Sequence, residues 1–210
     1  MITLHDYELS GNCYKIRLML GFLGVGYTTR HVDFYPGLEH RSEAFRAINP
    51  LAQLPVLDHD GFVIRDAQAI LTYLASTFDK GGSWGFGTSP RRDGEIAQWL
   101  AFAGELTGSI GAARLHDAFL FELDADAARR RGRELLRILD AHLWFQEREA
   151  HGWLASGENA SIADIACFPY VMLSEDADLS REECPSVRRW LDRFKRIDGF
   201  RVMSGVFPTR

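Results

Sequence analysis

The chain has 210 residues, of which 46% are hydrophobic, 12% aromatic and 25% charged. This composition is typical of a folded globular protein, and it excludes the disordered, collagen-like and fibrous classes. The formal net charge of −5, from 24 basic and 29 acidic residues, leaves no broad cationic surface for a phosphate backbone, so no nucleic-acid partner is expected.

The cysteines and the first residues indicate the cellular compartment. Cys13, Cys167 and Cys184 are too few and too scattered for a disulfide framework or a zinc site, which indicates a reducing environment. Residues 1–6 lack the basic and apolar regions of a signal peptide, and no apolar run approaches the ~20 residues of a membrane span. We therefore expect a cytoplasmic protein with no membrane partner.

Residues 1–80 alternate short strand patterns with helical ones. A helix between the first two strands implies a parallel crossover, and the turn at Asp58–Gly61 between the last two implies an antiparallel hairpin. The sequence thus predicts a small mixed sheet with the thioredoxin-like plan. The predicted strands are 1–5, 27–34, 55–57 and 62–64. The predicted helices are one that begins within Ser10–Lys15 and is closed by Gly24 and Gly26, and two more over 42–48 and 66–78.

Residues 81–90 are rich in glycine and end in proline, which is typical of a linker between domains. Residues 91–210 show helical periodicity and almost no strand signal. Ser161 followed by Asp164 is the pattern of a capping box and predicts the start of a core helix. We therefore expect an α/β thioredoxin-like domain, a linker and an all-α domain. The other predicted helices of the last segment are 91–116, 124–150 and 186–196.

The segment Ser10–Lys15 lies where the first predicted strand gives way to the first helix. A helix N-terminus offers unpaired amides and a partial positive charge, and both stabilise an anion such as a thiolate. Thioredoxin-like redox proteins place Cys-x-x-Cys here, whereas this chain has Ser10 and Cys13. A serine forms no disulfide, but its hydroxyl can donate to the thiolate of a bound molecule. The motif favours activation of a bound thiol, and a plain helix cap is the alternative role for Ser10.

Two further segments predict a site for a peptide-like ligand. Pro55 begins a strand, where it cannot donate to the sheet and where a cis bond would expose backbone groups of the preceding residue. Such an edge can pair with a peptide in β fashion. Asp66 opens the next helix, so a carboxylate and free amides meet there and suit a zwitterionic amino-acid group.

Together these segments resemble the cytosolic glutathione S-transferases. Within that family, Ser10–Cys13 with His40–Ser42 is most similar to the theta-like and related bacterial enzymes that use a serine. The resemblance implies the glutathione S-transferase fold, a homodimer, a role in detoxification, glutathione as co-substrate and no metal. It extends over nearly the whole chain, through Trp153–Ala155, Ser161–Asp164, Pro185–Leu191 and Gly199–Phe200.

The resemblance also implies a role for each matched residue. Ser10 would hydrogen-bond the glutathione sulfur, with Asn12 as support. Asp66 would hold the γ-glutamyl group, and the family's serine after this acid is Ala67 here, which predicts weaker glutathione binding. The main chain of Leu54, before a cis Pro55, would pair with the cysteinyl unit. The expected glutathione-binding residues are His40 and Arg41 at the glycyl carboxylate, Gln53, Leu54, Pro55, Asp66 and Ala67.

Tyr7 and Cys13 are the alternatives to Ser10. Other classes of the family place a catalytic tyrosine near Tyr7, and cysteine-dependent relatives form a mixed disulfide through a residue such as Cys13, for which a packed, inert thiol is the structural alternative. Lys15 and Arg17 are expected on the solvated side of the helix or in support of the local field. The second substrate is expected between the domains. Its candidate lining residues, for which core packing is the alternative role, are Ala103, Leu106, Ile110 and His116.

The expected reaction is attack of the glutathione thiolate on a small hydrophobic electrophile, a peroxide or a disulfide. The sequence is also compatible with two other functions. One is a non-catalytic ligand-binding or regulatory protein with the same fold, and the other is a glutathione-dependent disulfide reductase.

Overall fold

The N-terminal part of the computed structural model, which describes residues 1–203, is built on a four-stranded mixed sheet. β1 pairs in parallel with β2 and antiparallel with β3, and β3 pairs antiparallel with β4, so the strand order is β2-β1-β3-β4. The predicted crossover and hairpin are confirmed, and the sheet is thioredoxin-like. The strands are β1 (Ile2–Asp6), β2 (Thr28–His31), β3 (Val56–His59) and β4 (Phe62–Arg65).

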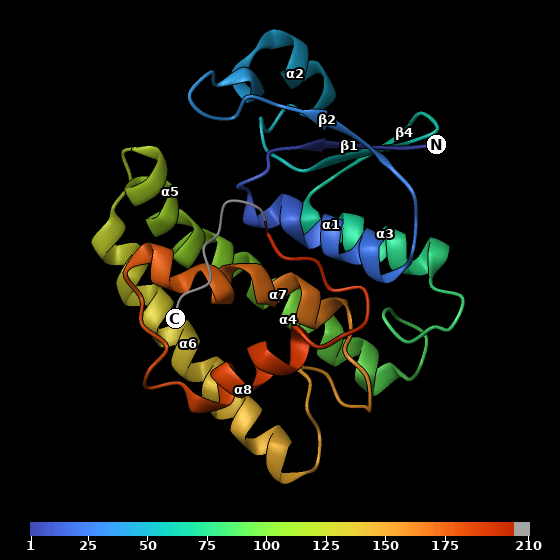
Figure 1. Ribbon diagram of the computed structural model, residues 1–210, viewed down its shortest axis with the longest axis vertical. Coiled ribbons are helices and arrows are strands. Elements are labelled where there is room, and N and C mark those ends of the chain that lie inside the picture. Colours follow the sequence, from blue (N-terminus) through green and yellow to red (C-terminus); the bar gives the residue numbers. More distant parts are fainter. Residues whose placement is uncertain (204–210) are drawn as a thin grey trace.

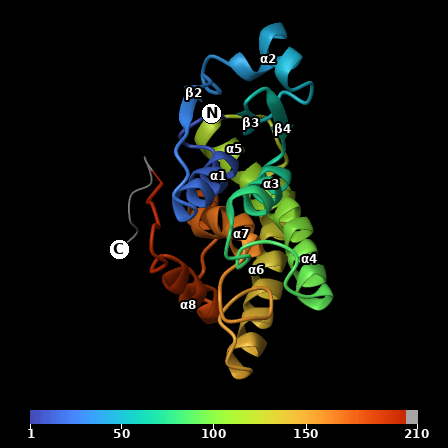
Figure 2. The same ribbon diagram turned by 90° about the vertical axis from the view of Figure 1, so that its right-hand side faces the viewer.

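Helices lie on both sides of this sheet (Figures 1 and 2). On one side, α1 (Gly11–Phe22) and α3 (Ala67–Phe78) lie between the sheet and the rest of the molecule. On the other side lie the short 3-10 turn η1 (Glu39–Arg41) and α2 (Glu43–Ile48). α1 is apolar over most of its surface because it is covered by the sheet on one side and by helices on the other.

From Pro90 onward, the described residues contain helices and no strand. The stretch predicted as one helix over 91–116 is helical throughout, but a π-helical turn, η2, separates it into two α-helices. The most buried helix is α7, every residue of which is enclosed from Ile162 to Val171. The segments are α4 (Pro90–Leu106), η2 (Thr107–Gly111), α5 (Ala112–Phe119), α6 (Ala125–Arg148), α7 (Ile162–Met172), η3 (Leu173–Ala177) and α8 (Pro185–Phe194).

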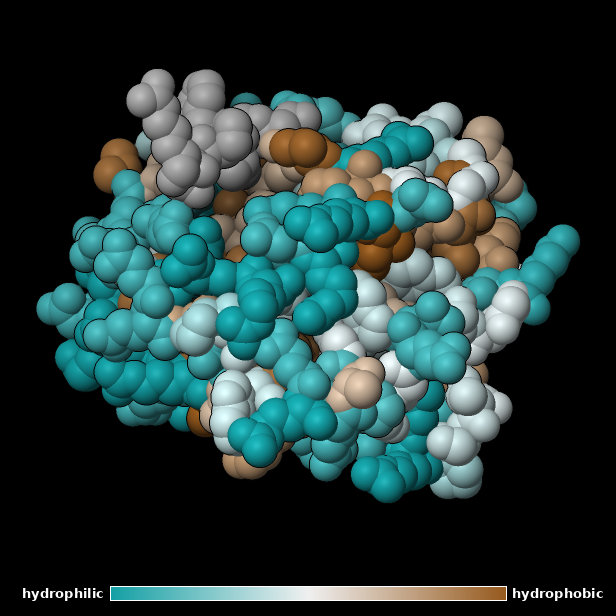
Figure 3. Space-filling view, turned by 60° about the horizontal axis from the view of Figure 1, so that its bottom comes forward, coloured by the Kyte–Doolittle hydropathy of each residue, from teal (hydrophilic) through white to brown (hydrophobic). Residues whose placement is uncertain are grey.

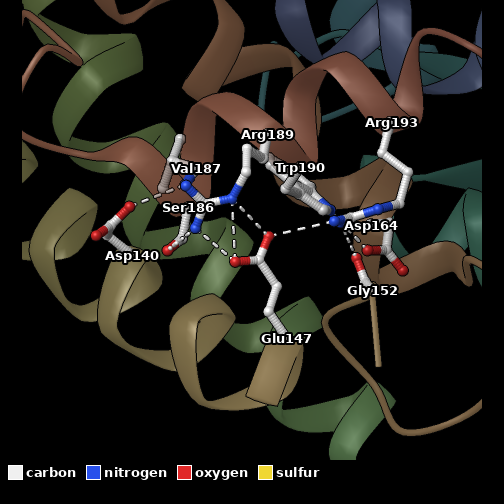
Figure 4. A network of polar contacts seen from close by, with 9 residues as sticks. All are labelled: Asp140, Glu147, Gly152, Asp164, Ser186, Val187, Arg189, Trp190 and Arg193. Carbon is white, nitrogen blue, oxygen red and sulfur yellow. Dashed lines mark hydrogen bonds and ion pairs between the residues drawn. The ribbon is translucent and has the colours of Figure 1, made fainter. Parts of the chain in front are cut away.

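The carboxylate of Asp164 in α7 contacts Trp190 of α8 (Figure 4) and the loop that precedes α7. It is fully buried, and it accepts hydrogen bonds from the amides of Ser161 at 2.9 Å and Leu154 at 3.0 Å. The indole of Trp190 in α8 donates to it at 2.9 Å. The predicted capping box is confirmed, and it also fixes the packing of two helices.

Ion pairs join the side chains of α8 to α6 at the surface. Glu147 accepts from Arg189 at 3.1 Å and from Arg193 at 3.2 Å (Figure 4). The surface at this end of the molecule is largely hydrophilic (Figure 3), so these pairs are screened by water and contribute little to stability. No helix within residues 1–203 combines the length and apolar character needed to cross a bilayer.

Lys15 is not on the solvated side of α1, contrary to the sequence expectation. It is fully buried, and its Nζ lies 5.1 Å from the centre of the Tyr170 ring in α7. No residue of the described part of the chain forms a hydrogen bond with this Nζ. The physical reason is that α7 covers the face of α1 that carries Lys15. Arg17 is half-buried and pairs with Asp6.

Candidate functional site

A pocket of about 640 Å³ lies between the sheet part and the helical part. The first residues of α1 and α3 both line it, so two helix N-termini contribute partial positive charge to its wall. The structure therefore brings together residues from distant segments of the sequence. The residues expected from sequence that line it are Tyr7, Ser10, Asn12, His40, Arg41, Gln53, Leu54, Pro55, Asp66 and Ala67.

Ser10 is partly exposed in the pocket and is also the N-cap of α1. Its Oγ accepts a hydrogen bond from the amide of Cys13 at 3.2 Å. This bond uses a lone pair of the hydroxyl, and the O–H remains able to donate. The capping role and a role as hydrogen-bond donor to a ligand are therefore compatible.

The two alternatives to Ser10 lie in different surroundings. Tyr7 lines the pocket, its hydroxyl is 3.5 Å from the carbonyl of Tyr35, and burial raises its pKa. Cys13 does not line the pocket. It is fully buried against apolar residues that include Val32 and Phe45, and burial raises the pKa of its thiol to about 12. A thiol with this pKa is protonated at neutral pH, which disfavours a nucleophilic Cys13.

The loop before β3 presents backbone groups to the pocket. Asn49 holds this loop, since its side-chain amide donates to the carbonyl of Gln53 at 2.8 Å and its oxygen accepts from the amide of Leu51 at 3.1 Å. The Leu54–Pro55 peptide bond is cis. Within residues 1–203, neither the N–H nor the C=O of Leu54 has a backbone partner, so both remain available to a ligand.

A basic corner of the pocket contains His40, Arg41 and Arg46. His40 is buried and stacks on Phe34 with 4.1 Å between ring centres. Burial, together with the charges of Arg41 and Arg46, lowers the pKa of His40. Arg46 was not expected from sequence, and it extends this corner of donors suited to a carboxylate.

Asp66 is the N-cap of α3 and has an uncommon backbone conformation for a residue other than glycine, with φ 73°. Its Oδ1 accepts from the amides of Gln68 at 2.9 Å and Ala69 at 3.0 Å. The side chain is exposed to the pocket, so its second oxygen is available. Backbone strain of this kind is common where a side chain is held for a ligand.

The residues expected to line the second half of the pocket lie elsewhere. Ala103, Leu106 and Ile110 are fully buried in the core, and His116 lies outside the pocket with its ring nitrogen 2.9 Å from Asp117. The helical segment does form the wall, but through a different face. Apolar spacing marks the face that packs on the core, and the pocket faces the neighbouring side, which carries Gly104, Thr107, Gly111, Arg114, Leu115 and Phe119.

Tyr170 of α7 also lines the pocket and was not expected from the sequence. A Cβ at Gly11 would lie 2.9 Å from its ring, and a Cβ at Gly111 would lie 2.8 Å from it. Both glycines therefore permit this close approach. The glycines were the available signal, but the sequence does not show which ring they accommodate.

Arg114 was also missed, because an arginine in a helix usually lies in water. Here it lines the pocket and is only 7% exposed. Its Nη1 donates to the carbonyl of Leu9 at 2.8 Å, and its Nε donates to Asp176 at 3.3 Å.

Among residues 1–203, no group of three or more His, Cys, Asp or Glu side chains is placed to hold a metal ion.

Comparison with known proteins identifies the fold. Residues 4–83 match the family model described as "Glutathione S-transferase, N-terminal domain". The crystal structure of glutathione S-transferase from Pseudomonas fluorescens superposes with a TM-score of 0.85 and 28% identity, over 97% of this chain and 98% of that one. The chain has the glutathione S-transferase fold. The expected fold class is thus confirmed.

Curated relatives extend this likeness to the full length of the glutathione S-transferase fold. GstB, a glutathione S-transferase of Escherichia coli K12, is 26% identical over 90% of this chain and 91% of its own length. Maleylacetoacetate isomerase of Rhizobium meliloti is 28% identical over 94% of this chain and 93% of its own. The structure of Ure2p in complex with glutathione has a TM-score of 0.82 at 25% identity, over 94% of this chain and 95% of that one. The chain is thus similar to these proteins over most of its length.

Proposed function

We propose that this chain is a glutathione transferase of the serine-using, theta-like type, which ionises the glutathione thiol at Ser10. The observation that carries the proposal is the position of Ser10 in the pocket, at the N-terminus of α1, with a hydroxyl that is able to donate. Names of relatives support glutathione as the ligand, since they include glutathione S-transferases and a glutathione complex. In the proposal, residues 1–80 form the glutathione-binding domain, 81–90 the linker and 91–210 the helical domain, of which residues 204–210 lie outside the described part of the chain.

The rest of the pocket accounts for the other groups of the tripeptide. His40, Arg41 and Arg46 would hold the glycyl carboxylate, and the free backbone groups of Leu54 would pair with the cysteinyl unit. Asp66 would accept the γ-glutamyl ammonium, while the amides at the start of α3 would hold its carboxylate. The volume of about 640 Å³ lies within the ~300–1,000 Å³ typical of small-molecule sites.

The energy needed to ionise the thiol is modest. A thiol of pKa ~8.5 is only a few per cent ionised at neutral pH, and lowering this value by ~2 units requires ~2.7 kcal/mol. One or two hydrogen bonds to a charged acceptor supply ~1.5–3 kcal/mol each, and a helix N-terminus adds to this. The thiol proton passes to solvent, and the thiolate then attacks the electrophile held beside it.

The test removes the Ser10 hydroxyl and separates its chemical role from its capping role. Ser89 offers a matched control, because it caps α4 through the amide of Arg92 at 3.3 Å and does not line the pocket. Ser10→Ala and Ser89→Ala should each cost ~1 kcal/mol of stability. Only Ser10→Ala should lower kcat/KM, by about 10- to 100-fold, and raise the pKa of the bound glutathione thiol, measured by its ultraviolet absorbance.

Equal activity of the two variants would overturn the assignment of Ser10, and Tyr7→Phe and Cys13→Ala, made in parallel, would then show which group replaces it. Calorimetry with glutathione at up to millimolar concentration tests the ligand itself, and an absence of binding would refute the proposed function. Binding without turnover would instead indicate a ligand-binding or regulatory protein.

The homodimer and the cytoplasmic location are further parts of the proposal. Light scattering of the purified protein measures whether it is a dimer.

A further inference from the structure

Arg114 is a buried cation in the pocket wall that the proposed glutathione site does not use. An arginine has five N–H donors, of which the bonds to Leu9 and Asp176 occupy two. Nη2 forms no hydrogen bond within residues 1–203, and it is not among the fully enclosed nitrogens that lack a partner. Nη2 is therefore unpaired and not fully enclosed, and the Arg114 side chain lines the pocket.

The position of the guanidinium places it near the reacting sulfur. Its Nη1 contacts the carbonyl of Leu9, which directly precedes Ser10. The basic corner assigned to the glycyl carboxylate lies on a different segment, around η1 and α2, and already has the three side chains of His40, Arg41 and Arg46. Arg114 is thus a second positive group, on the wall that α5 contributes to the pocket.

A row of aromatic rings begins at this cation and continues along the pocket. The guanidinium lies 5.3 Å from the centre of the Phe119 ring, and Phe119 lies 5.9 Å from Tyr7. Tyr7 in turn lies 5.5 Å from Phe34, and all three rings line the pocket. Such a surface favours a flat ligand. The planar guanidinium beside it is suited to donate hydrogen bonds to a carboxylate.

Asp176 does not cancel this charge. It contacts only Nε, from which it is 3.3 Å distant, and its side chain is 41% exposed, so water screens it. The opposite edge of the guanidinium remains the side that a ligand anion would contact. Since the cation is largely removed from water, a hydrogen bond from it to an anion should be strong.

We propose that Arg114 determines the specificity of this pocket for flat electrophiles that carry an anionic group, such as aromatic carboxylates. The inference rests on the proposed function for its reaction. With a chloronitrobenzoate, the glutathione sulfur forms a bond to the ring carbon that bears chlorine, and the carbon–chlorine bond breaks. Chloride leaves with the bonding electron pair, the thiol proton passes to solvent, and the carboxylate stays ionised against Arg114.

The test compares chloronitrobenzoate with its neutral methyl ester, each rate being divided by the uncatalysed rate with glutathione. The wild-type protein should prefer the acid. Arg114→Met should lower kcat/KM for the acid by about 10- to 100-fold and for the ester by less than about threefold. Arg114→Lys should retain part of the preference because it keeps the charge. Arg131→Met, which removes a surface arginine outside the pocket, is the matched control and should leave both substrates unchanged.

Equal losses for acid and ester in Arg114→Met would mean a structural role and would overturn the inference. Equal turnover of the ester and the acid by the wild-type protein would also overturn the inference. That result would leave the proposed function intact. Binding of the unreactive nitrobenzoate and its methyl ester, measured by calorimetry, decides the matter even without turnover. The acid should bind more tightly than the ester, and Arg114→Met should abolish that difference; equal binding to the wild-type protein would refute the inference.

Discussion

Replacing Lys15 with methionine is expected to stabilise the protein near neutral pH. The side chain is fully buried, and its ammonium has the Tyr170 ring as a neighbour but no hydrogen-bond partner in the described structure. Burial lowers the pKa of Lys15 from its ordinary value of 10.5 to about 8, although electrostatic interactions with Asp66 and with the Cys167 thiol oppose this. A buried ammonium without a partner costs free energy that an apolar side chain does not.

The pKa difference sets the magnitude of the effect. At ~1.36 kcal/mol per pKa unit, charging Lys15 in the fold costs the folded state about 3 kcal/mol relative to the unfolded chain. Methionine gives up a contact between cation and ring worth ~0.5–2 kcal/mol. The net gain in the free energy of unfolding for Lys15→Met should therefore be about 1–3 kcal/mol near neutral pH.

The sign of the pH dependence follows from proton binding. Between a pH of about 8 and 10.5, the unfolded chain holds the Lys15 proton and the folded chain does not, so wild-type stability gains from this group as pH rises. The penalty is fully present below a pH of about 8 and disappears as pH rises through 10.5. The advantage of Lys15→Met should accordingly be largest near neutral pH and shrink in alkaline solution.

Urea denaturation at neutral and at alkaline pH measures this difference. Lys195→Met is the control, because Lys195 is 44% exposed and its contact with Asp192 is a surface pair; its effect should stay within ~0.5 kcal/mol at both pH values. A Lys15→Met protein that is less stable than wild type near neutral pH, or a stability difference that does not change with pH, would contradict the penalty assigned to the buried ammonium.

Three further substitutions have definite expected outcomes. Ala67→Ser adds a hydroxyl at the start of α3 inside the pocket, and it should lower KM for glutathione by about 3- to 10-fold in steady-state kinetics with little change in kcat. Gly111→Ala places a Cβ 2.8 Å from the Tyr170 ring, and it should cost ~1–3 kcal/mol in thermal unfolding and lower activity. Asp164→Ala leaves several buried donors without an acceptor, and it should cost at least ~3 kcal/mol in the same measurement.

Each of these substitutions has a neighbour as its control. Ala69→Ser lies on α3 outside the pocket, and an equal change in KM there would contradict the role of position 67. A Cβ at Gly108 would meet no atom within 4 Å, so Gly108→Ala should be neutral or slightly stabilising. Asp140 accepts one bond, from the amide of Val187 at 2.9 Å, so Asp140→Ala should cost only ~1 kcal/mol.

The sequence by itself determined those features that depend on neighbouring residues. Ser10 caps α1, Asp66 caps α3, and Ser161 with Asp164 forms the capping box, because each side chain bonds amides two or three residues away. The hairpin of β3 and β4 and the parallel crossover of β1 and β2 follow from short-range turn and spacing patterns in the same way. Ser10, Leu54, Pro55 and Asp66 could be predicted as ligand-facing residues for this reason, whereas His40, Arg41 and Gln53 were expected only from the resemblance to a known family.

Only the tertiary structure decided which faces are covered and which remain open. Lys15 is buried because α7 packs on α1, and Arg114 reaches the carbonyl of Leu9 although the two are 105 residues apart in the chain. Ala103, Leu106 and Ile110 pack in the core, whereas the adjacent face of the same helical segment, with Gly104 and Thr107, lines the pocket. Periodicity shows that a helix has an apolar side, but the surface that covers this side comes from distant residues, so their packing decides where the pocket forms.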